Sequence, residues 1–377
     1  MQSLPLRSPG VLLAPVLDTA IAYDLVAETT HRLNPSAAAL LEACCGDVDR
    51  DGLARRWATD SGVDIDVVDG AVTDALLEFT SLGLVGRTTT FEVPEPPAGC
   101  GQTADPTSRL GASHPVIDHR IGFRSPQPEL LDEIDDYLGT GLADVDANLV
   151  FDIHRTRDGH VHLQTDETWE FATIDRCLGQ LVSVLNDYAG FTYSCAVIHA
   201  AAVGSPDGEI VLLPGPSGQG KSTLAAAFLQ RGWDYLGDET IGVRPGTRDA
   251  VGYPKRLALD ARSREAIGLD PTPHGGRSGF VSAKPDMDPT ELRQGVAYLS
   301  GDVGPISRVL FPRFAEGTGV ELDDIPPDDA VIELLASTRN LGRAGQAALD
   351  GVCDLAASVP VQRLSYSDAR SAVAHLT

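Results

Sequence analysis

The residues best suited to chemistry lie in a short glycine-rich segment, GPSGQGKST, at positions 215–223. The segment fits the pattern G-x-x-x-x-G-K-[ST], in which glycines let backbone N–H groups approach a phosphate closely. Lys221 can reach the outer phosphates as a point charge, and the Ser222 hydroxyl can bind a magnesium ion. The spacing therefore predicts a site for a nucleoside triphosphate and Mg²⁺, and it leaves the choice between ATP and GTP open.

The elements around this segment give it the setting that phosphate binding requires. The apolar run GEIVLLP before it is typical of a buried strand, and TLAAAFLQ after it predicts a helix that stops at Gly232. A loop between such a strand and a helix N-terminus adds the positive end of the helix dipole to its N–H groups. The predicted nucleotide-binding residues are Gly215, Ser217, Gly218, Gln219, Gly220, Lys221, Ser222 and Thr223.

Two adjacent acids, Asp238 and Glu239, follow Lys221 by about seventeen residues and end the segment WDYLGDE. Transfer of a phosphoryl group to an alcohol needs neutralisation of phosphate charge and a group that accepts the hydroxyl proton. One acid of the pair can bind the metal together with Ser222 while the other acts as base. The sequence does not distinguish which acid has which role.

Several segments around these residues resemble the HPr kinase family, and more closely its HPr-kinase-related branch. They are IHAAAV, LLPGPSGQGKST, RGWDYLGDE, YPKRLALD and VLFPRF, so the resemblance extends over about residues 195–340. It implies an α/β fold, with an HPr-kinase-like P-loop core made of a mixed sheet and flanking helices. It also implies an ATP-dependent kinase that uses Mg²⁺ and can form a homo-oligomer.

The resemblance further assigns roles to residues outside the loop. It implies that His199 lies beside the catalytic acid, with Asp238 and Glu239 as the metal-binding and base pair. Lys255, Arg256 and Arg313 become candidates to neutralise charge in the transition state. The glycine-rich second signature of HPr kinases is absent, and the nearest stretch, HGGRSGF at 274–280, does not match it. HPr itself is therefore not the expected substrate, and some relatives in this branch phosphorylate ribosomally made peptides.

Residues 1–90 predict a small domain of short strands and three helices. VLLAPV, AIAYDLV and ETTHRL read as strands, and Asn34 and Pro35 suit the start of a helix over NPSAAALLEACC. RDGLARRWATD predicts a second helix and residues 67–82 a third, which Gly83 ends. The arrangement suits a winged-helix-like domain, and it resembles the PqqD-like RiPP recognition element. That resemblance implies a partner: the leader segment of a precursor peptide, added as a strand to an exposed sheet edge.

The rest of the chain divides by composition. Residues 91–113 are rich in Pro, Gly, Ser and Thr and read as a linker. Residues 114–377 are expected to form the kinase domain, with an accessory α/β part at 114–195 and the P-loop core at 196–377. The last helices and strand of this region carry no predicted chemistry.

Composition excludes other classes of protein. The net charge of −25 disfavours nucleic-acid binding, because an acidic surface repels phosphate backbones. No segment approaches the roughly 18 apolar residues of a membrane span, and the N-terminus is a poor secretory signal, so a cytoplasmic protein is expected. The six cysteines show no zinc-ligand spacing.

Together these features predict an ATP- and Mg²⁺-dependent kinase for a Ser or Thr hydroxyl of a peptide, held by its leader at the N-terminal domain. Two alternatives stay open at this point. One is a kinase for the hydroxyl of a small metabolite. The other is a nucleotide-binding switch that recruits a peptide for a different enzyme.

Overall fold

The computed structural model describes residues 3–95, 107–139, 146–165, 167–272 and 285–377. Contacts within the chain separate two compact units, Met1–Pro94 (unit 1) and Glu95–Thr377 (unit 2). The segment 274–280, Cys100 and the middle of the predicted linker, residues 96–106, lie outside the described residues.

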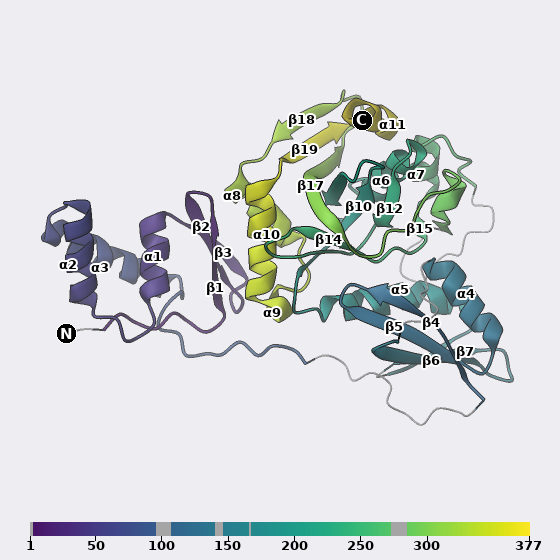
Figure 1. The fold of residues 1–377 in the computed structure, drawn as a ribbon, viewed down its shortest axis with the longest axis horizontal. Coiled ribbons are helices and arrows are strands. Elements are labelled where there is room, and N and C mark those ends of the chain that lie inside the picture. The colour runs from purple at the N-terminus through teal and green to yellow at the C-terminus, as the bar shows by residue number, and fades with distance from the viewer. Residues whose placement is uncertain (1–2, 96–106, 140–145, 166, 273–284) are drawn as a thin grey trace. The chain divides into compact units, whose positions relative to one another are not determined.

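Unit 1 is a three-stranded antiparallel sheet followed by three helices (Figure 1). The strand order is β1-β2-β3, and the bounds are β1 Val11–Val16, β2 Thr19–Asp24, β3 Thr29–Leu33, α1 Pro35–Ala43, α2 Arg50–Ser61 and α3 Ile65–Ser81. These elements confirm the strands and helices expected for residues 1–90. The winged-helix and PqqD-like interpretations stay predictions.

Local sequence explains where the helices of unit 1 begin and what they bury. The Asn34 side chain accepts a hydrogen bond from the N–H of Ala37 at 2.8 Å, which caps α1 ahead of Pro35. Along α3, Val72 and Phe79 are buried at the spacing of one helical face. The core of unit 1 therefore lies between the sheet and the apolar faces of the helices.

Unit 2 opens with the accessory α/β part, a five-stranded sheet of order β4-β5-β6-β7-β8. Two amphipathic helices, α4 and α5, pack on it and bury a continuous apolar core. The bounds are β4 Arg109–Val116, β5 His119–Ser125, α4 Pro128–Leu138, β6 Leu149–Arg155, β7 Val161–Gln164, β8 Thr168–Phe171 and α5 Ile174–Gly190.

The end of the predicted linker needs correction. The linker was expected to run over 91–113, but the described chain is already in β4 from Arg109, which pairs with Ser125 of β5. The small and polar residues at the start of β4 resemble a loop in composition. Strand pairing uses backbone groups, however, so it does not require large apolar side chains at the end of an edge strand.

The P-loop core is built on a mixed sheet with the path β12-β10-β11-β17-β14-β13-β9, extended by β19 and β18 (Figure 1). The first part of the long strand β17 pairs with β14, and its later part lies parallel to both β11 and β19. The strand bounds are β9 Ala196–Ile198, β10 Ala200–Gly204, β11 Ile210–Pro214, β12 Asp234–Gly237, β13 Ile241–Val243, β14 Asp249–Gly252, β17 Gly301–Phe314, β18 Glu321–Asp324 and β19 Val361–Tyr366. The mixed α/β architecture expected for this region is confirmed.

Helices cover the core sheet. Helices α6 and α11 share an apolar cluster with side chains of β11, β17 and β19, whereas α10 contacts β9 and β13. The bounds are α6 Lys221–Gln230, α7 Ala261–Ala266, α8 Pro327–Ala336, α9 Leu341–Ala344, α10 Gln346–Ser358 and α11 Ala369–Leu376, with a short pair β15 Leu257–Ala258 and β16 Asp286–Met287. Tyr188 of α5 and Tyr253 of the core belong to one buried cluster, so the accessory part and the P-loop core share a hydrophobic interior.

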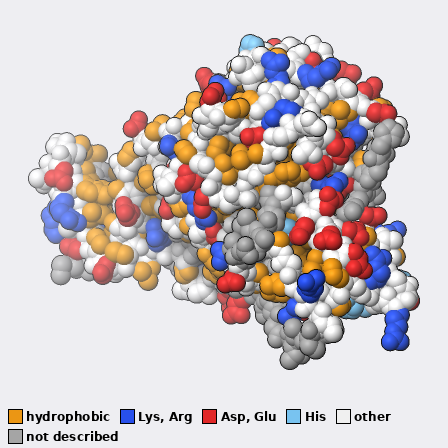
Figure 2. All heavy atoms as spheres, turned by 45° about the vertical axis from the view of Figure 1, so that its right-hand side comes forward, with side chains coloured by type: hydrophobic (Ala, Val, Ile, Leu, Met, Phe, Trp, Pro, Cys, Tyr) orange, Lys and Arg blue, Asp and Glu red, His pale blue; other side chains and the backbone are white. Residues whose placement is uncertain are grey.

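The surface drawn in Figure 2 carries side chains of both charges. On the face drawn in Figure 2, acidic and basic side chains are interspersed among exposed apolar ones. Across the described ranges, no helix combines the length and apolarity that crossing a membrane demands. The five cysteines within those ranges are free thiols, and all but Cys45 are buried.

Candidate active site

The predicted phosphate-binding loop joins β11 to α6, as expected from the sequence. Gly218 and Gly220 have φ angles of 87° and 92°, a conformation that glycine adopts without strain. At Gly220 the need for glycine is also steric, because an added Cβ would lie 2.4 Å from the Tyr366 hydroxyl. The loop therefore has the backbone conformation of a phosphate cradle, and the N-terminus of α6 begins directly behind it.

Lys221 is almost fully buried and folds back over the loop. Its ammonium group donates hydrogen bonds to the carbonyl oxygens of Gly215 and Pro216, at 2.7 and 3.0 Å. It also lies 3.0 Å from Nε2 of His199. The positive charge is thus held at the loop by acceptors that phosphate oxygens can replace.

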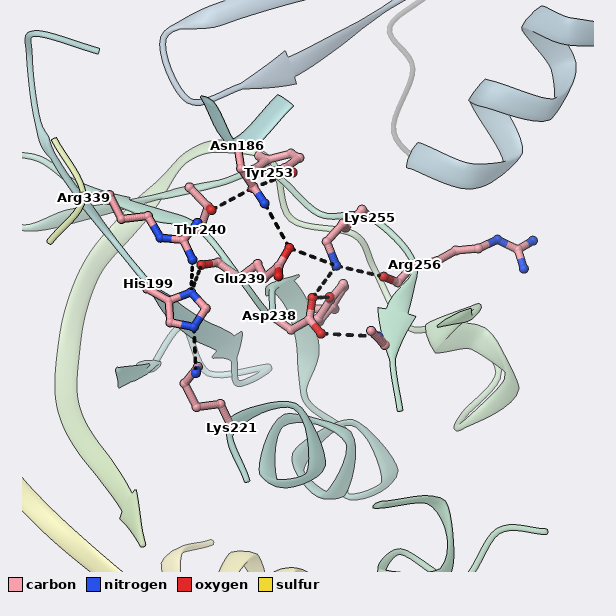
Figure 3. Close-up of polar contacts among 12 residues, drawn as sticks. Asn186, His199, Lys221, Asp238, Glu239, Thr240, Tyr253, Lys255, Arg256 and Arg339 are labelled. Carbon is pink, nitrogen blue, oxygen red and sulfur yellow. Dashed lines mark hydrogen bonds and ion pairs between the residues drawn. The ribbon is translucent and has the colours of Figure 1, made fainter. Parts of the chain in front are cut away.

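His199 connects the loop lysine to the acidic pair (Figure 3). Because the Lys221 ammonium can only donate, Nε2 of His199 is the acceptor, and Nδ1–H then donates to the carbonyl oxygen of Glu239 at 2.9 Å. Burial, reinforced by the charges of Lys221 and Arg339, lowers the pKa of His199 to about 4. The imidazole is therefore neutral near pH 7.

Arg339 approaches the same ring from a segment that carries no motif. The sequence gives no chemical signal here except a polar pair, Arg339-Asn340, between two apolar helices. The buried Asn340 amide accepts the N–H of Val197 at 2.8 Å and donates to the carbonyls of Thr192 and Cys195, at 3.1 and 2.9 Å. Arg339 in turn donates its own peptide N–H to the Val197 carbonyl at 2.8 Å. This clamp holds the backbone at Arg339, while its side chain stays exposed.

Asp238 is buried and fully engaged. Its Oδ1 accepts from the Lys255 ammonium at 2.8 Å and from the Tyr235 hydroxyl at 3.0 Å, and Oδ2 accepts the N–H of Ala258 at 3.3 Å. Burial alone would raise the pKa of Asp238, but the charge and hydrogen bonds of Lys255 outweigh it and lower that pKa. Asp238 is thus an ionised carboxylate, and it holds Lys255 in place.

Glu239 is the accessible acid of the pair, with 38% of its side chain exposed. The Asn186 amide of α5 donates to its Oε2 at 3.0 Å. The amide oxygen of Asn186 accepts from the hydroxyls of Thr240 and Tyr253, at 2.8 and 2.9 Å. Lys255 also lies 4.0 Å from Glu239 Oε2. A residue of the accessory part therefore orients the acid.

These groups meet in a cavity of about 470 Å³. Its wall brings together most of the residues predicted from the sequence, namely Ser217, Gly218, Gly220, Lys221, Ser222, Thr223, His199, Asp238, Glu239, Lys255 and Arg256. The wall also includes Asn186, which no motif indicated, and Phe314, which lies in the segment VLFPRF but was given no role.

Other predicted residues either do not line the cavity or point away from the Asp238–Lys255 pair. Gly215 and Gln219 belong to the loop but do not line the cavity. Arg256 lines it, yet its guanidinium points away from the Asp238–Lys255 pair and binds Asp136 of α4 at 2.7 Å (Figure 3). Arg313 is exposed on β17 and is not part of the wall, whereas its neighbour Phe314 is.

The glycine-rich loop gives the site groups that suit ATP and Mg²⁺, although the described side chains alone do not form a complete metal site. Within the described residues, no group of three or more His, Cys, Asp and Glu side chains could hold a metal ion. Magnesium in nucleotide sites usually binds one or two protein oxygens, substrate phosphates and water. The Ser222 hydroxyl, on the cavity wall, is an oxygen ligand of this kind.

Comparison with known proteins adds little to this geometry. No family model matches the chain, and no curated protein matches it. Among solved structures, the chain is similar to the Hpr(Ser) kinase/phosphatase from Coxiella burnetii, with 12% sequence identity and a TM-score of 0.24. The match covers 48% of this chain and 90% of that chain. A similarity at this level establishes neither a family nor an activity.

Proposed function

We propose that the chain is an ATP- and Mg²⁺-dependent kinase that phosphorylates a Ser or Thr hydroxyl of a peptide. The observation that carries the proposal is the convergence of four groups at one cavity. The phosphate loop supplies N–H groups, Lys221 supplies charge, and Glu239 supplies an accessible carboxylate. Neutral His199 forms hydrogen bonds with both the Lys221 ammonium and the backbone carbonyl of Glu239. Phosphoryl transfer depends mainly on such positioning and charge neutralisation.

The geometry suggests a separate role for each residue. ATP supplies the transferred phosphoryl group when bound, and Mg²⁺ neutralises phosphate charge. Glu239 accepts the proton of the acceptor hydroxyl, because it is the exposed acid and Asn186 orients it. Asp238 is already engaged by Lys255, so it positions that lysine near Glu239 rather than taking a proton. Ser222, which follows Lys221 on the cavity wall, would supply a hydroxyl ligand for Mg²⁺.

The peptide part of the proposal rests on unit 1. Its helices enclose an apolar groove of about 700 Å³, lined by residues of α1, α2 and α3 that include Trp57, Val67 and Val68. In the described part of unit 1, β3 pairs only with β2, which leaves an edge that an extended peptide can join. A leader held there raises the concentration of the attached acceptor near the kinase without further contacts.

Mass spectrometry of candidate peptides after incubation with ATP and Mg²⁺ tests this function. The candidates are small precursor peptides encoded beside the gene, each with its leader and after leader removal. A phosphate-sized mass gain should appear on Ser or Thr with the wild-type chain and vanish with Lys221→Ala. Arg157→Ala, an exposed change in the turn between β6 and β7, should retain it.

Other outcomes would redirect the assignment. Transfer that ignores the leader would remove the role proposed for unit 1. Transfer to a free sugar or amino acid, with no reaction of any peptide, would indicate a small-metabolite kinase. Nucleotide binding without transfer to any acceptor would indicate a switch.

A further inference from the structure

Three parallel strands of the core end at the same edge of the sheet. β11 is parallel to β17, and β17 is parallel to β19 with Phe314 opposite Tyr366 in register. Ligands of open α/β sheets bind at the carboxyl ends of parallel strands. The carboxyl end of β11 leads into the phosphate loop, whereas β17 and β19 each end in an aromatic residue. That pair of rings therefore lines the same cavity as the phosphate loop.

The two rings and an arginine form an open aromatic platform. Phe314 is 39% exposed, and its ring centroid lies 6.2 Å from that of Tyr366 at an interplanar angle of 83°. The guanidinium carbon of Arg262, in the first turn of α7, lies 5.1 Å from the Phe314 centroid. All three side chains line the same cavity as the phosphate loop. A large exposed aromatic ring with a cation over its face is a surface that suits flat, π-rich ligands.

Tyr366 fixes this platform relative to the phosphate cradle. It is buried, and its hydroxyl donates to the carbonyl oxygen of Gly220 at 3.4 Å. A side chain at position 220 would collide with that hydroxyl. Tyr366 therefore holds this pair of aromatic rings next to the loop. A ligand whose phosphates occupy the loop can then place its base on the Phe314 ring.

We propose that Phe314, supported by Tyr366 and covered by Arg262, is the site on which the purine base of the nucleotide stacks. The base displaces the Arg262 guanidinium from the ring face that this cation now covers. This inference rests on the proposed function, since it requires that the loop bind a nucleoside triphosphate. It adds a second contact area, distinct from the phosphate contacts, that distinguishes a nucleotide from inorganic polyphosphate.

Calorimetric titration of the full chain with Mg·ATP and with Mg·tripolyphosphate separates the two contributions. Phe314→Ala should weaken ATP binding about 5- to 150-fold, the range expected for loss of one base–aromatic stack. The same variant should leave tripolyphosphate binding unchanged, and Phe314→Tyr, which keeps the ring, should restore ATP binding. Thermal unfolding of each variant checks that the fold is retained.

The outcomes distinguish failure of the inference from failure of the function. If wild-type chain binds neither ligand, the proposed nucleotide site itself is wrong. If wild-type chain binds both ligands and Phe314→Ala leaves ATP binding unchanged, the stacking platform is wrong. Equal losses for ATP and tripolyphosphate in Phe314→Ala would also overturn it, because the effect would then arise from the phosphate loop.

Discussion

The guanidinium of Arg339 lies 2.6 Å from Nδ1 of His199, although 140 positions separate the two residues in the sequence. With Lys221 at Nε2, a neutral imidazole is flanked by two cations. In the tautomer that satisfies both Lys221 and the Glu239 carbonyl, Arg339 faces a ring N–H rather than a lone pair. A phosphate oxygen would be a better partner for Arg339 than this ring N–H, so the arrangement suits an anion beside the imidazole.

Replacement of Arg339 by Ala is therefore expected to slow phosphoryl transfer. Loss of one preorganised charge at a developing anion typically costs roughly 10²- to 10³-fold in kcat. Arg339→Lys should recover part of that loss, since it keeps the charge without the planar fork. Steady-state kinetics with the identified acceptor measure the effect, with Arg157→Ala as the matched control. Unchanged kcat in Arg339→Ala would remove Arg339 from the site.

Acidification should destabilise the chain through His199. The unfolded chain binds this proton with the ordinary pKa of 6.5, whereas the folded chain binds it only near a pKa of about 4. Between these values the unfolded state holds more protons, so the free energy of unfolding falls as pH is lowered from 6.5 to 4. His199→Gln should show a shallower fall across this window in denaturant titrations at a series of pH values. If the free energy of unfolding fell equally with pH in the wild type and in His199→Gln, the lowered pKa of His199 would be contradicted.

The buried Asp238–Lys255 pair should behave as one unit in stability measurements. Lys255→Met leaves a buried carboxylate without its partner and is expected to cost about 3–5 kcal/mol of unfolding free energy. The double variant Lys255→Met, Asp238→Leu should be less destabilised than the single one. Additive losses, measured by denaturant unfolding, would show that the two side chains do not interact.

The same pair predicts a pH range of full stability. The pKa of Asp238 is lowered from 3.8, so its contribution is present above that value and is lost as pH falls through the native pKa. The pKa of Lys255 is raised from 10.5, because Asp238 and Glu239 outweigh its burial. Its contribution is therefore complete below pH 10.5 and is lost only as pH rises through the native pKa. The double variant Lys255→Met, Asp238→Leu should show neither the loss of stability at low pH nor the loss at high pH.

Glu239→Gln should separate catalysis from stability. We expect kcat to fall about 10²- to 10⁴-fold if Glu239 accepts the hydroxyl proton. Its partly exposed side chain should make the cost in unfolding free energy small, unlike that of Asp238→Asn. Glu209→Gln, on an exposed turn of the same core, is the matched control. Retained activity in Glu239→Gln would move the role of base elsewhere.

Local signals predicted the parts of the site that the chain encodes contiguously. The loop at 215–223 and the acids after β12 follow from spacing, because a phosphate cradle is a local backbone structure. Asn186 and Arg339 could not be predicted in this way, since tertiary packing brings Asn186 to the cavity from α5 and Arg339 to the His199 ring from the segment after α8. Arg256 and Arg313 show the complementary case. Their residue type suits phosphate, but Asp136 holds the Arg256 guanidinium away from the Asp238–Lys255 pair, and Arg313 is exposed outside the cavity wall.

The hydrogen bond from Asn186 to Glu239 has a consequence for exchanging parts between related chains. The accessory part resembles a separate module in sequence, with its own sheet and two helices. It nevertheless supplies the amide that orients the proposed base, and it shares its interior with the core. A chimera joined near residue 195 would break the Asn186–Glu239 hydrogen bond and the shared hydrophobic interior, whereas a junction after Pro94 would leave these contacts intact. Unit 1, for which we propose substrate recognition, is thus the part that recombination can replace without disturbing the contacts around Glu239.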